Sequence, residues 1–259
     1  MGMLKRCETR MKIAGYTIRN TKIADKPNED LFFFDKKTGF VLLLDGVSRD
    51  KINGIYPDPS PAAEAAKIIQ EESYAYYMRH IPAVNNPEDL LISAAMTANE
   101  KVLEYNKSKK LTFLAGAVGI FGSLQNGDFH YLYIGDCYGR IICGESVSIF
   151  TTCQTENIAK HKKEYTTYQI RNEICNNPGH ACGYGVMNGD PNASFFMRTG
   201  LIRREQYDRI VLSSDGPEDY LMSCSAKQLR QYSCKKLIEC SVQGTDQDDM
   251  TILTIERAK

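Results

Sequence analysis

Residues 40–46 read FVLLLDG, an apolar run of five that ends abruptly in an aspartate and a glycine. An uninterrupted apolar run of this length, bounded by turn residues, is typical of a buried β-strand. The strand end places the carboxylate of Asp45 at the edge of the core, where the glycine lets the backbone approach a ligand closely. Residues 209–216, RIVLSSDG, repeat this arrangement around Asp215. Both stretches predict a carboxylate site at the end of a sheet.

The remaining pattern predicts strands and helices in an α+β order. We expect further strands at 12–20, 31–35, 111–124, 129–134, 140–143 and 250–256. We expect helices at 62–79, 88–106, 156–174, 218–224 and 226–241, and an irregular surface loop at 176–189. Short connections such as Asn126-Gly127 favour antiparallel pairing, because parallel strands need long crossovers. No linker or repeat divides the chain, so we expect a single domain over residues 1–259.

The charge and the cysteine content of the chain indicate which partners and which cellular compartment to expect. The 32 Lys and Arg residues balance 32 Asp and Glu residues, so a net charge of zero provides no overall basic field for nucleic acid or an acidic membrane surface. The nine cysteines include no Cys-x-x-Cys pair, and reduced thiols are expected in a chain of this length. No stretch approaches the roughly 20 apolar residues of a membrane span. We therefore expect a cytoplasmic protein without nucleic-acid or membrane partners.

Carboxylates recur at the ends of the predicted strands. They are Glu29, Asp30, Asp45, Asp136, Asp215, Asp248 and Asp249. Clustered carboxylates repel one another and raise each other's pKa unless a cation neutralises them, so their convergence at one sheet end would predict bound Mg²⁺ or Mn²⁺. Oxygen-only ligands suit these hard ions rather than zinc. The alternative is that each acid simply occupies a turn, because turns favour aspartate and glycine in any protein.

Six short blocks follow one another along the chain. They are NED at 28–30, VLLLDGV at 41–47, AGAV at 115–118, YIGDCYGR at 133–140, IVLSSDGPED at 210–219 and DDMTI at 248–252. In this order they resemble the protein phosphatase 2C family, the metal-dependent protein serine/threonine phosphatases, over about residues 23–255. The block at 210–219 is the most specific. The resemblance is to the bacterial-type branch, and it implies a sandwich of two antiparallel β-sheets flanked by helix pairs.

The resemblance implies metal-binding roles for individual residues. Asp45 would bridge two metal ions, and Asp215 and Asp248 would complete the coordination of one of them. Glu29 and the carbonyl of Gly46 would serve the other ion, partly through water. These residues are all present in the expected order.

Further features of the family also have counterparts in this chain. Asp136, together with Asp215, fits the weaker third metal site of the bacterial branch. Asp30 and Asp249 would stand behind the ligands and orient them. Residues 151–189 occupy the place of the family's variable, flap-like segment near the metals, although a solvated helix and loop is an equal alternative.

The implied reaction is hydrolysis of phosphoserine and phosphothreonine in proteins. Two Mn²⁺ or Mg²⁺ ions, or three if the third site is filled, would activate a water molecule. We therefore assign no side-chain nucleophile. A phosphoprotein is the expected substrate, and a protein kinase would act as antagonist. The identity of the substrate, the choice of ion and the oligomeric state stay open.

Phosphate capture departs from the family pattern. The usual arginine, four residues before the entry glutamate, is replaced by Asp25. Lys22, Lys26 and Arg49 are the candidates for holding the phosphate, although lysine lacks the bidentate fork of arginine. This departure keeps two alternatives open. One is a catalytically weak or inactive phosphatase-like regulator that binds a protein partner, and the other is a hydrolase of small-molecule phosphates.

Overall fold

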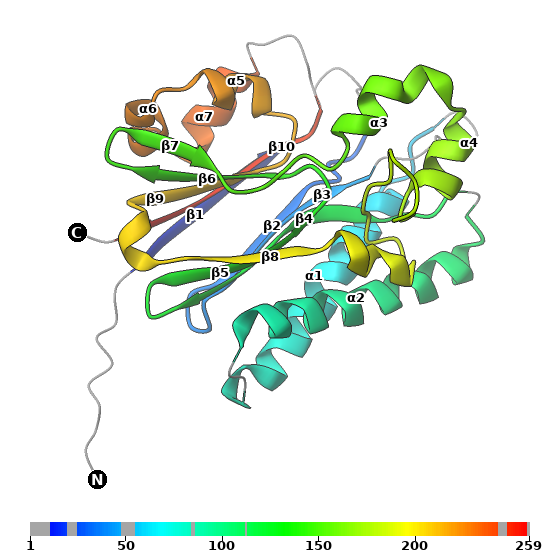
Figure 1. The fold of residues 1–259 in the computed structure, drawn as a ribbon, viewed down its shortest axis with the longest axis horizontal. Helices are drawn as coiled ribbons and strands as arrows, with labels where there is room; N and C mark the ends of the chain where they lie inside the picture. Colours follow the sequence, from blue (N-terminus) through cyan, green and yellow to red (C-terminus); the bar gives the residue numbers. More distant parts are fainter. Residues whose placement is uncertain are drawn as a thin grey trace.

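Two five-stranded antiparallel β-sheets face each other in the computed structural model, which describes residues 11–19, 25–47, 55–83, 86–111, 113–242 and 248–257 (Figure 1). The sheet ordered β1-β10-β9-β6-β7 consists of Met11–Ile18, Met250–Arg257, Arg209–Ser213, Tyr138–Cys143 and Ser146–Ile149. The sheet ordered β2-β3-β4-β5-β8 consists of Leu31–Asp35, Phe40–Gly46, Ala117–Gln125, Asp128–Ile134 and Arg198–Ile202. The predicted α+β sandwich is confirmed.

Strand β3 is buried on both faces. Val41 and Leu43 pack in the core between the two sheets, whereas Leu42 and Leu44 pack in a second core against helices on the outer face. All four side chains are fully buried. A strand that is covered on both faces has no polar side, which explains the uninterrupted apolar run at 40–44.

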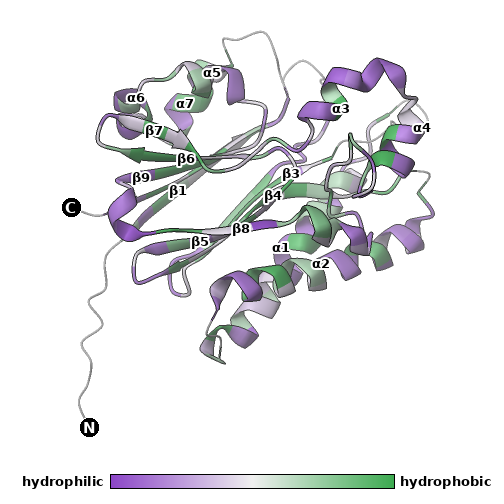
Figure 2. Cartoon of the chain, in the orientation of Figure 1, coloured by the Kyte–Doolittle hydropathy of each residue, from purple (hydrophilic) through white to green (hydrophobic). Residues whose placement is uncertain are grey.

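Helices cover the outer faces of both sheets (Figure 1). The hairpin of α1 (Pro61–His80) and α2 (Pro87–Lys109) packs on the second sheet, and the side chains of Ser60 and Asn86 cap the two helices. A one-turn 3₁₀ helix, Ile81–Ala83, follows α1. The first sheet is covered by α5 (Glu218–Ser223), α6 (Ala226–Gln231) and α7 (Cys234–Ser241). Figure 2 shows hydrophobic residues concentrated along the strands between these layers.

Two long predicted helices are divided in the structure. The stretch 156–174 consists of α3 (Glu156–His161), a 3₁₀ turn, α4 (Thr167–Gln169) and a π-helical turn at Ile170–Ile174. Within it only Ile158 and Ile174 are buried, so little packing favours one continuous helix. The stretch 226–241 breaks at Tyr232, which is extended, and Ser233 then caps α7.

Other sequence predictions failed where local polarity was misleading. Strands β7 and β8 were not predicted, because the residues of β7, SVSI, are all exposed and β8, RTGLI, begins with two exposed polar residues. The predicted strand at 111–124 begins only at Ala117, because the amide of Asn106 on α2 exchanges hydrogen bonds with the backbone of Ala115. The predicted surface loop at 176–189 is largely inside the protein. Asn176 is 1% exposed and bonds to the carbonyl of Val186.

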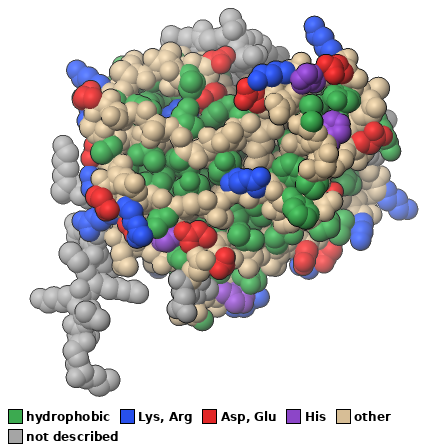
Figure 3. Space-filling model, viewed as in Figure 1, with side chains coloured by type: hydrophobic (Ala, Val, Ile, Leu, Met, Phe, Trp, Pro, Cys, Tyr) green, Lys and Arg blue, Asp and Glu red, His purple; other side chains and the backbone are tan. Residues whose placement is uncertain are grey.

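Figure 3 shows how charged and hydrophobic side chains are distributed over one face of the molecule. Acidic and basic side chains both lie around the rim of this face, and hydrophobic side chains are scattered across its middle. Within the ranges that the structure describes, no helix is both long and apolar enough to span a membrane.

The burial of β3 leads to a stability prediction. Leu43→Ala should lower the free energy of unfolding by about 2–5 kcal/mol, because it removes a fully buried side chain from between the sheets. Met222→Ala is the matched control, since Met222 is 62% exposed and its loss should change stability by less than about 0.5 kcal/mol. Urea unfolding followed by circular dichroism measures both. Equal effects would contradict the assignment of β3 to the core.

Candidate functional site

The strand register brings the predicted carboxylates to one end of the sandwich. In the second sheet Asp45 pairs with Val118 near the start of β4, and Gly119 pairs with Ile134 at the end of β5, just before Asp136. In the first sheet Asp215 follows the end of β9, and Asp248 precedes the start of β10. Because these strands are antiparallel, the end of one lies beside the start of its neighbour. Residues far apart in the sequence therefore meet.

Mutual electrostatic effects show how close these groups are. Burial raises the pKa of Asp45 well above its usual value, and the charges of Asp30, Asp215, Asp136 and Asp248 raise it further. Burial by the surrounding protein raises the pKa of Asp215 to about 7, and the charges of Asp136 and Asp248 add to this shift. One side of the Asp215 side chain is nevertheless exposed to solvent. A hydrogen bond with Asp45 partly opposes that shift. These carboxylates form one electrostatic cluster.

Asp136 and Asp30 complete this part of the cluster. Burial raises the pKa of Asp136, while a 2.9 Å hydrogen bond from Thr155 Oγ1 opposes the shift. Thr155 belongs to the stretch 151–189 and directly precedes α3, so this stretch contacts Asp136. Burial raises the pKa of Asp30 to about 8, with the charges of Asp249 and Asp215 adding to it. Asp30 Oδ2 is buried and has no hydrogen-bond partner among the residues described.

Lys26 lies inside the other part of the cluster. Its Nζ is 2.9 Å from Asp248 Oδ1 and 3.3 Å from both Glu29 Oε2 and Asp249 Oδ2. The lysine side chain is 4% exposed, and those of Glu29 and Asp249 are 2% and 3% exposed. The hydroxyl of Ser60 donates to Glu29 Oε1, and the Glu29 amide donates to Asp249 Oδ2. These three carboxylates are therefore already held by protein donors.

The two Asp-Gly pairs each pack against another acidic segment. A Cβ atom at Gly46 would lie 2.5 Å from the carbonyl oxygen of Glu29, and one at Gly216 would lie 2.2 Å from that of Asp249. Any side chain at either position would push the neighbouring acidic segment away. Glycine is therefore required here for close approach, as the sequence pattern suggested, but the approach is to backbone.

Sequence analysis located the acidic residues but not their protein partners. Ser60 and Thr155 each stand immediately before a helix, which is the usual signal for a cap and gives no hint of a contact with the site. Two of the three phosphate-binding candidates, Lys22 and Arg49, lie outside the described residues. The third, Lys26, contacts carboxylates.

The donors fit a hard divalent cation in their chemistry. They are oxygen atoms only, they raise one another's pKa, and one buried carboxylate oxygen of Asp30 has no partner. In this structure, however, the carboxylate oxygen atoms do not point toward one common position. Across the described ranges, no three His, Cys, Asp or Glu side chains are grouped so that they could hold one ion together. Side chains would have to turn toward a common point on binding.

Comparison with known proteins identifies the fold. No family model and no curated protein sequence matches the chain. The structure superposes on the serine/threonine phosphatase PstP/Ppp of Mycobacterium tuberculosis with a TM-score of 0.70, at 16% identity, over 96% of this chain and 99% of that one. The fold is that of the protein phosphatase 2C-type bacterial serine/threonine phosphatases. The resemblance drawn from the six sequence blocks is confirmed at the level of the fold.

Two further phosphatase 2C-type structures support this identification. The serine/threonine phosphatase Stp1 from Staphylococcus aureus has a TM-score of 0.70 and 16% identity, over 97% of this chain and 96% of its own. The catalytic domain of PstP in complex with two manganese ions matches with the same TM-score and identity, over 96% and 99%. The similarity extends across nearly the whole length of each chain.

Cysteine-based phosphatase chemistry is not supported. The spacing Cys-x5-Arg, typical of phosphatases with a cysteine nucleophile, occurs at Cys224 and Arg230. Burial raises the pKa of Cys224, which disfavours the reactive thiolate. Arg230 pairs with Glu145, and the residues between them form a capped helix rather than a phosphate loop.

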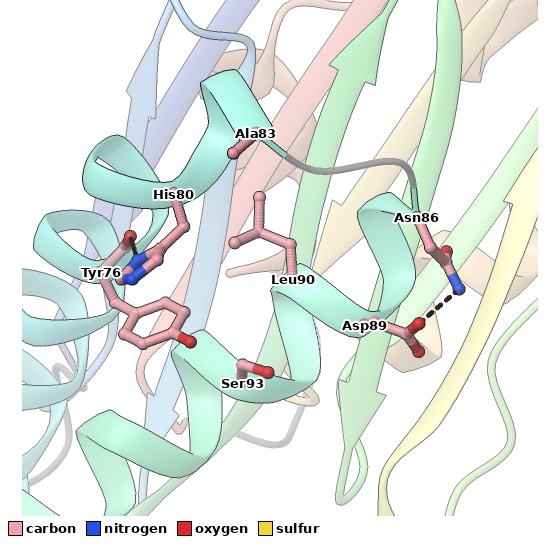
Figure 4. A pocket seen from close by; sticks show the side chains of 7 residues that line it. All are labelled: Tyr76, His80, Ala83, Asn86, Asp89, Leu90 and Ser93. Carbon is pink, nitrogen blue, oxygen red and sulfur yellow. Dashed lines mark hydrogen bonds between the residues drawn. The ribbon is translucent and has the colours of Figure 1, made fainter.

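A separate pocket opens at the end of the α1–α2 hairpin (Figure 4). It is lined by Tyr76, His80, Ala83, Asn86, Asp89, Leu90 and Ser93. His80 is engaged with the carbonyl of Tyr76, and Asn86 with Asp89. The pocket contains none of the clustered carboxylates, so we treat it as distinct from the candidate site.

The raised pKa of Asp30 predicts how stability depends on pH. An unfolded aspartate has a pKa near ~4, so between about pH 4 and pH 8 the folded chain binds a proton that the unfolded chain lacks. This contribution stabilises the fold at low pH and is lost as the pH rises to about 8. Chelator-treated protein should therefore become less stable from pH 5 to pH 8 in urea titrations, and Asp30→Asn should flatten that dependence. Identical slopes for both proteins would contradict the assignment.

Proposed function

We propose that this protein is a metal-dependent phosphomonoester hydrolase that removes phosphate from phosphoserine and phosphothreonine in proteins. The observation that carries the proposal is the convergence of Asp45, Asp136, Asp215 and Asp248 from separate strand ends at one end of the sandwich. A phosphatase 2C-type fold over 96% of the chain supports it. The enzyme class is protein serine/threonine phosphatase.

The metal ligands would be the residues that the sequence blocks indicate. Asp45 would bridge two ions, with Asp215 and Asp248 at one of them and Glu29 and the Gly46 carbonyl at the other. Asp136 would join Asp215 at a third position. Mn²⁺ or Mg²⁺ suits the oxygen donors, and the manganese complex of PstP supports a divalent ion. Bound divalent ions would lower the pKa of a water molecule and neutralise phosphate oxygens.

The side chains of this protein would hold and orient that centre. Asp30 and Asp249 would stand behind the ligands, where Asp249 Oδ2 already accepts from the Glu29 amide at 2.9 Å. The open side of the site lies at Asp215 and Asp248, and the Asp248 side chain is 57% exposed. A phosphorylated side chain would enter there. Thr155 ties the segment 151–189 to Asp136, so this segment would shape the entrance.

The partners follow from this chemistry. A phosphoprotein would be the substrate and a protein kinase the antagonist, in a bacterial cytoplasm, with no nucleic-acid or membrane partner. Phosphate would be held by Lys22 or Arg49 rather than by Lys26, whose Nζ is already surrounded by three carboxylates.

A second candidate is a phosphatase-like regulator with little or no turnover. It is favoured by Asp25 in the place of the phosphate-binding arginine and by the engagement of Glu29 with Lys26 and Ser60. Such a protein would bind a partner through the same end of the sandwich. It predicts no phosphate release from any phosphopeptide, even with saturating Mn²⁺.

Hydrolysis measurements separate these functions. Purified protein with Mn²⁺ should hydrolyse p-nitrophenyl phosphate and release phosphate from phosphothreonine peptides. Asp45→Asn and Asp215→Asn should each lower kcat/KM by roughly 100-fold or more, since each removes a metal ligand. Glu104→Gln is the matched control, because this exposed carboxylate pairs with Lys101 on the surface of α2 and its loss should leave kcat/KM unchanged.

Three other results of these hydrolysis measurements would each point to a different conclusion about the function. Turnover that survives exhaustive chelation would exclude the metal mechanism. Folded protein without turnover would favour the regulator. Efficient hydrolysis of small phosphate esters, with phosphopeptides refused, would indicate a small-molecule substrate.

A further inference from the structure

The buried ammonium group of Lys26 occupies a position among carboxylates that is typical of a bound cation. Its Nζ lies 2.9–3.3 Å from oxygen atoms of Glu29, Asp248 and Asp249. These residues come from opposite ends of the chain, and the segments before β2 and β10 meet where the Glu29 amide donates a hydrogen bond to Asp249 Oδ2. The lysine is 4% exposed, so solvent does not share in its neutralisation.

The charge of this lysine is firmly maintained. Its Nζ donates a 2.9 Å hydrogen bond to Asp248 Oδ1, and carboxylate oxygens of Glu29 and Asp249 each lie 3.3 Å away. Removing one partner from a buried ion pair is costly, because the remaining charges lose their neutralisation. Lys26 is therefore a fixed positive charge in this half of the site.

Glu29 has little capacity left for a metal ion. Its Oε2 faces Lys26 at 3.3 Å, and its Oε1 accepts the hydrogen bond from Ser60, which also caps α1. The same serine thus links this carboxylate to the first turn of a 20-residue helix. Turning Glu29 toward a metal ion would break both contacts.

In the part of the chain that the structure describes, no lysine or arginine is paired with the carboxylates of the other half of the site. Among the ion pairs between described residues, none involves Asp45, Asp136 or Asp215. Asp248 bridges the halves, because its Oδ1 faces Lys26 while its Oδ2 makes no hydrogen bond to a described residue. Asp45, Asp215 and Asp248 Oδ2 therefore remain available to one ion.

Building on the proposed function, we infer that the Lys26 ammonium takes the place of one of the two divalent ions, the one that Glu29 and the Gly46 carbonyl would hold. The centre then binds one ion fewer than the resemblance to phosphatase 2C implies, with the lysine as a permanent neighbouring cation. A lysine supplies a single positive charge where a divalent ion supplies two, and it cannot exchange with solvent.

Metal counting tests this inference without relying on activity. Mn²⁺ is titrated calorimetrically into wild-type protein, Lys26→Met and Lys26→Gln, and the ions bound are counted by native mass spectrometry. Both variants should bind one more Mn²⁺ per chain than the wild type, because the ammonium group no longer occupies the position among Glu29, Asp248 and Asp249. Lys101→Met is the matched control, since Lys101 pairs with Glu104 on the surface and should leave the count unchanged.

A third variant keeps the inference testable if the two Lys26 variants do not fold. Glu29→Gln retains Lys26 and should leave the Mn²⁺ count of the wild type unchanged, because Glu29 is not a metal ligand while the lysine is in place. Folding is checked by circular dichroism, since the chain has no tryptophan to report it. A lower count in Glu29→Gln would overturn the inference.

The remaining outcomes separate this inference from the proposed function. Equal, non-zero counts in the wild type and both Lys26 variants would overturn the role of the lysine and leave a metal-dependent phosphatase intact. No Mn²⁺ bound to any of the proteins would overturn both.

Discussion

Electrostatic repulsion among carboxylates is the constraint on which this end of the molecule depends. Glu29, Asp45, Asp136, Asp215 and Asp248 are drawn from strand ends that are distant in sequence, and packing keeps them close. Burial raises the pKa of both Asp45 and Asp215, and the charges of the neighbouring carboxylates raise it further. Near Glu29 the protein supplies a cation of its own, Lys26. The site is thus divided into a neutralised half and an unneutralised half.

The sandwich explains how such a repulsive cluster is maintained. Strand β3 is buried on both faces, so the position of Asp45 is fixed by the hydrophobic packing of the residues before it. Gly46 and Gly216 bring the two Asp-Gly turns against the backbones of Glu29 and Asp249. The free energy of core packing therefore offsets the electrostatic cost at the strand ends. Perturbed carboxylates of this kind are common at sites that bind charged ligands.

Much of the fold could be predicted because two-sided burial leaves a clear pattern. The predicted bounds of β2, 31–35, agree with the structure, and β9 lies within the predicted stretch 209–216. Strands β7 and β8 could not be predicted, since their exposed and polar residues carry no such pattern. The division of 156–174 depends on the lack of packing around α3 and α4, which local helix propensity does not report.

The acidic residues of the candidate site could be predicted from the sequence, but the contacts that these residues make with other side chains could not. Asp45 and Asp215 follow apolar strands, a signal visible in the sequence itself. Lys26 stands in a polar stretch that gives no sign of burial, and its partner Asp248 lies 222 residues away. Such a contact is set by tertiary structure alone. The roles of the acids as metal ligands stay a prediction.

The central claim is that the unneutralised carboxylates form a metal centre. A crystal structure of the protein soaked in Mn²⁺, with the anomalous signal of manganese recorded, tests it most directly. We expect an anomalous peak within coordination distance, about 2.0–2.3 Å, of oxygen atoms of both Asp45 and Asp215. Fully occupied manganese elsewhere on the molecule, with none at Asp45, would contradict it.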